Sequence, residues 1–265
     1  MKKLLLALVI LVAVFAGIWY ALSRVDWIKL FKLEQATEKT EKKLGDLLWE
    51  TYSRNETEVE DPLVRKSVDS LVTRICKANG IDRNSIQLHV FEKSEVNAFA
   101  FPGGHLTVFT GLIRDMENPE ELTGVISHEI AHIRLKHVMK KLTKEIGLSV
   151  LISIATGTGD GAVIGEIIKM LSSTAFDRRL EKQADLAAID YMVKANVDPL
   201  PLADFMERLA DKEEAKADEY LSWMSTHPES GARAVYIREY AGKKVSDPDP
   251  VLSAGTWKKI RESVK

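Results

Sequence analysis

The chain opens with its longest apolar run. Lys2 and Lys3 precede an unbroken apolar stretch that extends from residue 4 to residue 22. At a helical rise of about 1.5 Å per residue, this stretch nearly crosses a hydrocarbon core of about 30 Å. Lysines on its N-terminal side keep that end in the cytoplasm. The pattern therefore predicts a segment that exports the rest of the chain.

Two outcomes remain open for residues 1–25. Val14, Phe15 and Ala16 can serve as a small-residue cleavage site, which would make the segment a signal peptide. The run is longer than the apolar core of a usual signal peptide, which favours an uncleaved membrane anchor. A lipoprotein is excluded, because no cysteine lies near the end of the run. We expect an exported domain that is anchored by residues 4–22, or soluble after cleavage.

Two amphipathic helices are predicted next. Residues 26–58 are charged and helix-favouring, and they form a connecting helix. Its apolar positions at helical spacing are Leu44, Leu47, Leu48 and Tyr52. Asp61 and Pro62 are typical of a cap and a first turn, and the second helix ends at Asn79 and Gly80. Its apolar positions are Val64, Val68, Leu71, Val72 and Ile75. Each helix has one apolar face, with which it is expected to pack against the rest of the domain.

Short strands follow. Residues 86–91 (IQLHVF) and 105–109 (HLTVF) have strand composition, and residues 102–104 (PGG) form a turn before the second of them. Residues 97–101 (NAFAF) between the two are partly extended. We therefore predict a small β-sheet within a mainly helical α+β domain.

The second half of the chain is helical. Residues 118–121 (NPEE) begin a long helix that we expect to continue to Leu142. Residues 147–172 contain two apolar halves, each shorter than the about 20 residues that a spanning helix needs. They predict a helical hairpin over the functional site, and a membrane-associated loop is the alternative. Further helices are expected at 174–194, 201–212 and 231–240, before a loose tail at 243–265 that carries Trp257.

Composition narrows the chemistry. The 265 residues suffice for one catalytic-sized domain and an export segment. The chain has 37 basic and 39 acidic side chains, so no net field recruits nucleic acid. Cys76 is the only cysteine, which excludes an intrachain disulfide and a thiolate cluster. We expect Cys76 to be a small buried side chain. Any metal must therefore be bound by histidines and carboxylates.

The candidate chemistry lies in SHEIAH, residues 127–132. On a helix, His128 and His132 share one face and lie about 6 Å apart along the axis, which suits one zinc ion. Glu129 can reach a water at that ion without binding the ion itself. The alternative is a surface helix with incidental histidines. The apolar neighbours Ile130 and Ala131 favour a buried helix, in which unpaired imidazoles would be costly.

A catalytic zinc ion needs a third protein ligand. The extended HExxHxxGxxH pattern fails at its last two fixed positions, and His137 lies on another face, where we expect it solvated or at the helix end. Glu181 and Asp185 in FDRRLEKQAD are four residues apart. The first can bind zinc while the second accepts the outer N–H of a ligand histidine. An ordinary charged helix is the alternative reading.

Together these motifs resemble the HtpX-like and CAAX-prenyl-protease family of gluzincin zinc metallopeptidases. SHEIAH is followed, after a hydrophobic insertion, by an arginine-rich ExxxD helix, and NAFAFPGG, NPEEL and residues 225–228 (STHP) also match the pattern. The motifs cover residues 60–240. The layout is most similar to the periplasmic branch of BepA and LoiP type. The family's larger members have several membrane spans, whereas this chain has one apolar run of spanning length.

The resemblance implies a zincin fold for residues 59–242 and a role for each matching residue. His128, His132 and Glu181 would bind one Zn²⁺, Glu129 would be the general base, and Asp185 would orient a ligand. His227 would either stabilise the oxyanion or block the resting site, with Arg233 as its neighbour. The implied activity is cleavage of misfolded or misassembled envelope proteins on the periplasmic side of the inner membrane.

Substrate binding and a rival function complete the predictions. A sheet edge beside the metal can add a peptide strand with little sequence preference. The candidate residues are Asn97, Ala98, Phe99, His105, Leu106 and Thr107. Phe99 and Phe101 are also core candidates, and His89 and His105 also fit ordinary strand positions. The rival is a membrane-tethered chaperone for unfolded proteins with a structural zinc. Cleavage of prenylated peptides inside the membrane needs a multi-span chamber, for which one apolar run is too few.

Overall fold

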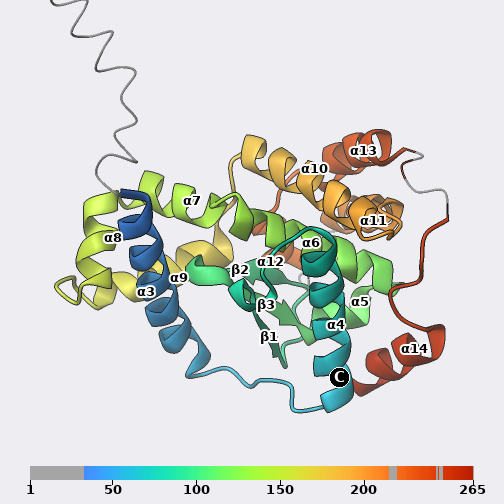
Figure 1. The fold of residues 1–265 in the computed structure, drawn as a ribbon, viewed down its shortest axis with the longest axis horizontal. Coiled ribbons are helices and arrows are strands. Elements are labelled where there is room, and N and C mark those ends of the chain that lie inside the picture. The colour runs from blue at the N-terminus through green and yellow to red at the C-terminus, as the bar shows by residue number, and fades with distance from the viewer. Residues whose placement is uncertain (1–32, 215–219, 243, 245–246, 265) are drawn as a thin grey trace, which may run out of the picture. The chain divides into compact units, whose positions relative to one another are not determined.

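The computed structural model describes residues 33–214, 220–242, 244 and 247–264 (Figure 1). The chain divides into two compact units, residues 1–40 and 41–265, and the helices and strands that build the site lie in the second. The predicted export segment at residues 4–22 falls outside the described residues. Among the helices that are described, none combines the length and the apolar character needed to cross a bilayer.

The two predicted N-terminal helices are present. Helix α3 spans Leu33–Ser53, within which Leu44 and Leu48 are fully buried. Helix α4 spans Pro62–Ala78, and its cap is Asp61, whose carboxylate accepts a hydrogen bond from the backbone N–H of Leu63. The predicted apolar positions of α4 form its buried face, and Cys76 is buried among them as a free thiol. The pattern of apolar residues therefore located both helices.

The sheet has three strands in the order β1-β3-β2. Strand β1 (Gln87–Phe91) is parallel to β3 (His105–Phe109), and β2 (Ala98–Ala100) is antiparallel to β3 on its other side. The predicted turn before β3 is a short 3-10 helix, Pro102–Gly104. Gly104 has a positive φ of 89°, and a Cβ there would lie 2.0 Å from the carbonyl oxygen of Ser85. Only glycine allows this approach of the turn to the chain before β1.

The expected long helix is two helices. Helix α5 (Thr110–Asp115), which was not predicted, precedes α6 (Pro119–Arg134), and α7 (His137–Glu145) follows. Between α6 and α7, Lys136 has a left-handed backbone with φ of 59°. That conformation ends α6 and redirects the chain, so the prediction of one helix continuing to Leu142 was wrong.

The predicted hairpin is formed by α8 (Leu148–Ala155) and α9 (Ala162–Ser173). The helices after it are α10 (Arg178–Lys194), α11 (Leu200–Glu214), α12 (Leu221–Thr226) and α13 (Ser230–Ala241). Helix α10 begins four residues later than expected, because the carboxylate of Asp177 caps it by accepting from the backbone N–H of Arg179 at 2.9 Å. The short α12 was not predicted.

The C-terminal tail is not loose. Residues Ala254–Ser263 form helix α14, with the hydroxyl of Ser253 as its cap. Trp257 is buried on it, and its indole N–H donates to the carbonyl oxygen of Glu117 at 3.3 Å. The proline-rich stretch before α14 hid this helix from the sequence pattern. The tail packs on the domain and belongs to it.

Helix α6 is the centre of the fold. It packs against α10, α11, α4 and β2, as the ribbon shows (Figure 1). All residues from Glu121 to His132 are buried. One apolar core lies around α4, α6 and α11, and a second joins the sheet to α7, α8 and α9. A helix surrounded in this way holds its side chains in fixed positions, and it carries SHEIAH.

Candidate metal centre

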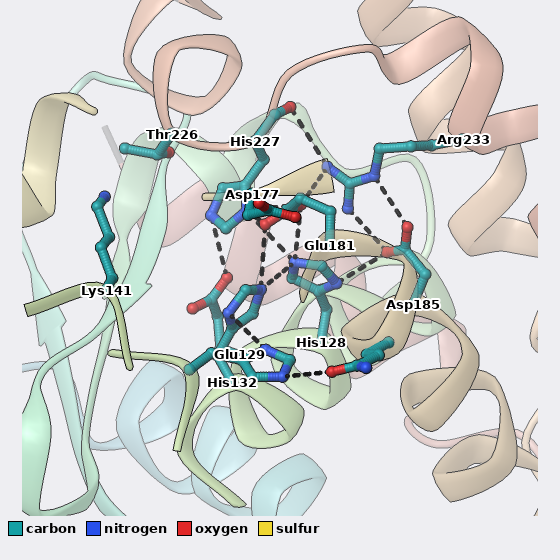
Figure 2. Close-up of polar contacts among 12 residues, drawn as sticks. His128, Glu129, His132, Lys141, Asp177, Glu181, Asp185, Thr226, His227 and Arg233 are labelled. Carbon is teal, nitrogen blue, oxygen red and sulfur yellow. Dashed lines mark hydrogen bonds and ion pairs between the residues drawn. The ribbon is translucent and has the colours of Figure 1, made fainter. Parts of the chain in front are cut away.

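Four potential ligands from three elements meet at one point. His128 and His132 come from α6, Glu181 comes from α10, and His227 directly follows α12. All four side chains are buried, and one ligand atom from each lies within 4.8 Å of the others. Figure 2 shows the three imidazoles and the carboxylate turned toward one another. His128 and His132, four residues apart on α6, thus lie opposite Glu181, which begins the predicted four-residue pair on α10.

The distances between these atoms suit a small tetrahedral ion. Nε2 of His128 lies 3.0 Å from Nε2 of His132 and 3.3 Å from Nδ1 of His227. Glu181 oxygens lie 3.5 Å from Nε2 of His128, 3.3 Å from Nε2 of His132 and 3.1 Å from Nδ1 of His227. A tetrahedral zinc ion with bonds of about 2.0–2.1 Å separates its ligand atoms by about 3.3–3.4 Å. The set therefore fits zinc.

The outer ring nitrogens fix where the protons are. Nδ1 of His128 lies 2.8 Å from Oδ1 of Asp185, which places a proton on Nδ1. Nδ1 of His132 lies 3.3 Å from Nδ1 of His137, whose Nε2–H donates to Oε1 of Gln183 at 3.2 Å. His132 therefore also has its proton on the outer side. The inner Nε2 lone pairs of both histidines face one another, an arrangement that a cation stabilises.

His137 takes one of the two places expected for it, a helix end, but its contact with a ligand was not predicted. Its side chain is buried, not solvated, and it occupies the first position of α7. The left-handed Lys136 turns the chain so that His137 comes back onto His132. This ring is a partner of a ligand, which the sequence reasoning missed. A signal for it would have been a break between α6 and α7, and nothing in the apolar spacing indicates one.

Arg233 connects α10 to the loop that carries His227. Its guanidinium is buried, and it donates from Nε to Oδ2 and from an NH2 group to Oδ1 of Asp185, at 2.9 and 2.7 Å. It also lies 2.7 Å from Oε2 of Glu181 and donates to the carbonyl oxygen of His227 at 3.3 Å. The hydroxyl of Tyr236 donates to Asp185 as well. Arg233 therefore holds three parts of the site together.

The two carboxylates that α10 contributes to the site are ionised. Burial by itself would raise the pKa of Asp185, but Arg233 and His128 outweigh it and hold that pKa well below its usual value. Burial would likewise raise the pKa of Glu181, and His227 and Arg233 lower it far more. Burial also lowers the pKa of His132 to about 4. At neutral pH the site thus offers a carboxylate and a neutral imidazole, the protonation states that zinc requires.

Glu129 differs from the other carboxylates. Burial, followed by the negative charge of Glu181, raises its pKa well above the usual value, against the opposing effect of Arg233. Its Oε1 lies 3.4 Å from Nε2 of His227. Among the described residues neither of these two atoms has a hydrogen-bond partner. A buried carboxylate of raised basicity beside the ligands, with an oxygen left over, has the properties of a general base.

The predicted substrate residues separate into two groups. Asn97 precedes β2, and its side-chain amide donates to the hydroxyl of Ser222 on α12 at 2.6 Å. Strand β3 is paired on both sides, which corrects the expectation that His105, Leu106 and Thr107 lie at an edge. Of the candidate residues, Ala98 and Phe99 of β2 remain, together with Asn97. The ring of Phe99 is buried in the core beside the rings of Phe101 and Phe109.

Comparisons with known proteins cover most of the domain. The family model of Peptidase family M48 matches residues 62–241, which include all four potential ligands, Asp185 and Arg233. The chain is 31% identical to Metalloprotease LoiP of Escherichia coli (strain K12) over 168 residues, which are 61% of this chain and 65% of the relative.

Two further relatives are longer. The chain is 29% identical to the mitochondrial Metalloendopeptidase OMA1 of Bos taurus over 232 residues, 77% of this chain and 44% of the relative. It is 24% identical to the Beta-barrel assembly-enhancing protease of Escherichia coli (strain K12) over 184 residues, 65% of this chain and 38% of the relative. The chain therefore spans less than two thirds of the first relative and less than half of these two.

Proposed function

The chain belongs to peptidase family M48, whose matched members are named as metalloproteases, and from this membership we propose that it is a zinc-dependent endopeptidase. The family predicted from SHEIAH and the ExxxD helix is thereby confirmed. The proposal is carried by one observation: two imidazole lone pairs, a carboxylate and a third imidazole converge within 4.8 Å in a buried site. We propose one Zn²⁺ per chain, bound by His128, His132 and Glu181.

The residues around the ligands would transfer protons and orient the ligand rings. Bound zinc would supply Lewis-acid polarisation of the scissile carbonyl and of the attacking water. Glu129 accepts the proton of that water, and its raised pKa lets it return the proton to the leaving amine. Asp185 holds the ring of His128, and His137 holds the ring of His132, so that both inner nitrogens keep their direction.

Of the two roles expected for His227, the geometry supports the blocking one. Nδ1 of His227 is one of the four ligand atoms, and it therefore takes the position that water and substrate need in an open catalytic site. With Nδ1 among the ligands, the ring proton is on Nε2, which faces Glu129. We propose that this arrangement is a resting form, and that His227 leaves the ligand set before a peptide is cleaved.

Strand β2 is the proposed substrate edge. The backbone N–H of Phe109 donates to the carbonyl of Asn97, and the N–H of Phe101 donates to the carbonyl of His105. Since donors alternate along an antiparallel strand, the backbone groups of Ala98 and Ala100 point to the other edge. A peptide strand added there would be held by backbone hydrogen bonds, with little preference for sequence. Unfolded chains would therefore be the substrates.

The location is part of the proposal. Residues 4–22 have the composition of a membrane anchor, and one relative is named for enhancing β-barrel assembly. We propose an exported enzyme that is anchored by residues 4–22 on the periplasmic side and cleaves misfolded or misassembled envelope proteins. The rival is a zinc-stabilised chaperone without catalysis. The position of Glu129 favours the enzyme, because its buried Oε1 beside the ligands has no hydrogen-bond partner among the described residues and a purely structural zinc site needs no base.

A Glu129→Gln variant separates the two functions. We expect it to keep its zinc but to lose cleavage of casein, an unfolded substrate, because the amide cannot accept a proton from water. The same substitution at Glu166, which is exposed on α9, is the matched control and should leave both zinc and cleavage unchanged. Equal cleavage by Glu129→Gln and the unaltered protein would contradict the proposed peptidase.

A further inference from the structure

The segment between α9 and α10 lies against the His227 loop. The backbone N–H of Phe176 donates to the carbonyl oxygen of Thr226 at 3.2 Å, directly before His227. The ring of Phe176 lies 4.3 Å from the ring of His132 and 5.9 Å from that of His227, centre to centre, and it is stacked on the latter. His227 also stacks on Trp223, with 4.3 Å between the ring centres. Two aromatic rings thus pack against the imidazole of His227.

Lys141 of α7 contacts the segment between α9 and α10. Its ammonium donates to the carbonyl oxygen of Thr174 and, at 3.4 Å, to that of Met170. It also lies 4.5 Å from the centre of the Phe176 ring. The carbonyls that it binds end α9, which itself packs against α12. One side chain therefore connects α7, the end of α9 and the segment that carries Phe176.

The burial of Lys141 is unusual for a lysine. Its residue exposure is 6%, and no carboxylate among the described residues forms an ion pair with its ammonium, on which the charges of Glu181 and Glu145 act from farther away. Burial lowers its pKa to about 8. A buried ammonium without an acidic partner costs stability, and an apolar side chain would fill the same place at less expense. The contacts of Lys141, rather than stability, therefore explain its presence here.

We propose that Lys141 and Phe176 are positioning residues that keep His227 in the fourth ligand place. Lys141 fixes the end of α9 and the ring of Phe176, and Phe176 then fixes the carbonyl of Thr226 and the plane of the His227 ring. The other three ligands have further contacts of their own, with Asp185, His137 and Arg233. Loosening Lys141 would therefore release His227 first, because His132, which Phe176 also contacts, is still held by His137. This inference rests on the proposed resting role of His227.

The test replaces Lys141 in the full-length protein and follows the ligand set by spectroscopy. Cobalt(II) is substituted for zinc, since its visible absorption spectrum reports the ligands of the ion. We expect Lys141→Met to shift the spectrum toward that of His227→Ala, and Lys141→Arg, which can still donate to both carbonyls, to restore it. Lys140→Met, which removes an exposed lysine of the same helix, is the matched control and should leave the spectrum unchanged.

Activity gives the second readout. Lys141→Met should raise kcat/KM on casein about 5-fold, as expected from losing one hydrogen bond of ordinary strength. In a His227→Ala background the same substitution should change kcat/KM less than about 2-fold, which is the additivity error, because its effect passes through His227. Phe176→Leu should shift the cobalt spectrum in the same direction, which provides a test if Lys141→Met does not fold.

Two results would overturn the inference. The first is a cobalt spectrum of Lys141→Met, or of Phe176→Leu in its place, that is identical to that of the unaltered protein. The second is an equal change of kcat/KM with and without His227, which would make Lys141 a general structural residue. Failure of the proposed peptidase looks different: the protein and Glu129→Gln would then act alike on casein, while the cobalt spectra still report the position of His227.

Discussion

The domain contains two clusters of neighbouring histidines, and they differ in the direction of their lone pairs. The first is the metal centre. The second, the sheet cluster, consists of His89 on β1 and His105 on β3 with Glu58, Gln87 and Trp49 around them. His89 Nε2 lies 3.2 Å from His105 Nδ1, close to the spacing found between imidazoles in the metal centre.

In the sheet cluster every ring proton has an acceptor. Nδ1–H of His89 donates to Glu58 at 3.0 Å, Nδ1 of His105 lies 3.2 Å from Nε2 of His89, and Nε2 of His105 lies 3.4 Å from the amide nitrogen of Gln87 and 3.5 Å from Oδ1 of Asp46. Donors and acceptors alternate along this chain, so the neutral rings are satisfied without an ion. In the metal centre the outer protons point away and the lone pairs meet. The direction of the lone pairs, and not proximity, therefore distinguishes a metal site.

The largest expected difference follows from removing one histidine from each cluster. His132→Ala should lose bound zinc and reduce casein cleavage by at least about 1000-fold, since both the ion and the water that it activates are lost. His105→Gln should retain the zinc content and most of the cleavage. Metal analysis and casein assays of the two purified variants check this. Loss of zinc from His105→Gln would show that the clusters are not independent.

A smaller effect is expected from the acceptor behind His128. Asp185→Asn keeps an oxygen for Nδ1–H but removes the charge that pairs with Arg233. We expect zinc affinity to fall by about 10- to 100-fold, as for other partners of metal ligands. Asp190→Asn on the same helix, at a half-exposed carboxylate, is the matched control. Competition with a chelator measures both affinities, and equal values would refute the role of Asp185.

The contact of His137 should matter less than that of Asp185. His137→Ala removes the acceptor behind His132, and we expect zinc affinity to fall about 10-fold, because a neutral hydrogen bond is weaker than one to a carboxylate. His137→Gln, which can still accept at that position, should recover part of the loss. The same chelator competition checks the order of the two variants, and an Ala variant with unchanged affinity would remove His137 from the site.

The sheet cluster should contribute the smallest effect, and it concerns stability. Burial, and then the neighbouring His89, lower the pKa of His105 from 6.5 to about 4. Between pH 6.5 and pH 4 the unfolded chain therefore binds more protons at this ring than the folded chain does. The contribution of the neutral ring to the free energy of unfolding is complete above pH 6.5 and is lost as the pH falls toward 4.

We expect this loss to be about 1 kcal/mol, after allowance for solvent near the ring. Urea unfolding at pH 7 and pH 4.5 measures the loss, with His105→Gln as the reference that lacks it. If the unaltered protein and His105→Gln lose the same free energy of unfolding between the two pH values, the assigned protonation of the sheet cluster is wrong.

The sequence was most informative where spacing alone decides geometry. SHEIAH and the ExxxD motif each place two functional residues four positions apart, on one face of a helix. The packing of α6 against α10 brings these two faces together. The apolar pattern also located α4, the sheet and the α8–α9 hairpin. In each case the helical or strand period itself determines which side chains share a face.

The misses depended on tertiary structure. His137 reaches His132 only because Lys136 adopts a left-handed backbone, which no periodicity signals. The central place of β3 depends on which strands pair, and the six residues of α12 are too few to show a helical period. Helix α14 follows a proline-rich stretch that reads as a linker. The role of His137, and the choice between the two roles expected for His227, therefore required coordinates.

The most direct test of the central claim is a crystal structure of the purified protein with anomalous data at the zinc edge. The account predicts one zinc peak per chain, about 2.0–2.1 Å from Nε2 of His128, Nε2 of His132, an oxygen of Glu181 and Nδ1 of His227. A peak at another place, or no peak among these side chains in protein that cleaves casein, would contradict it.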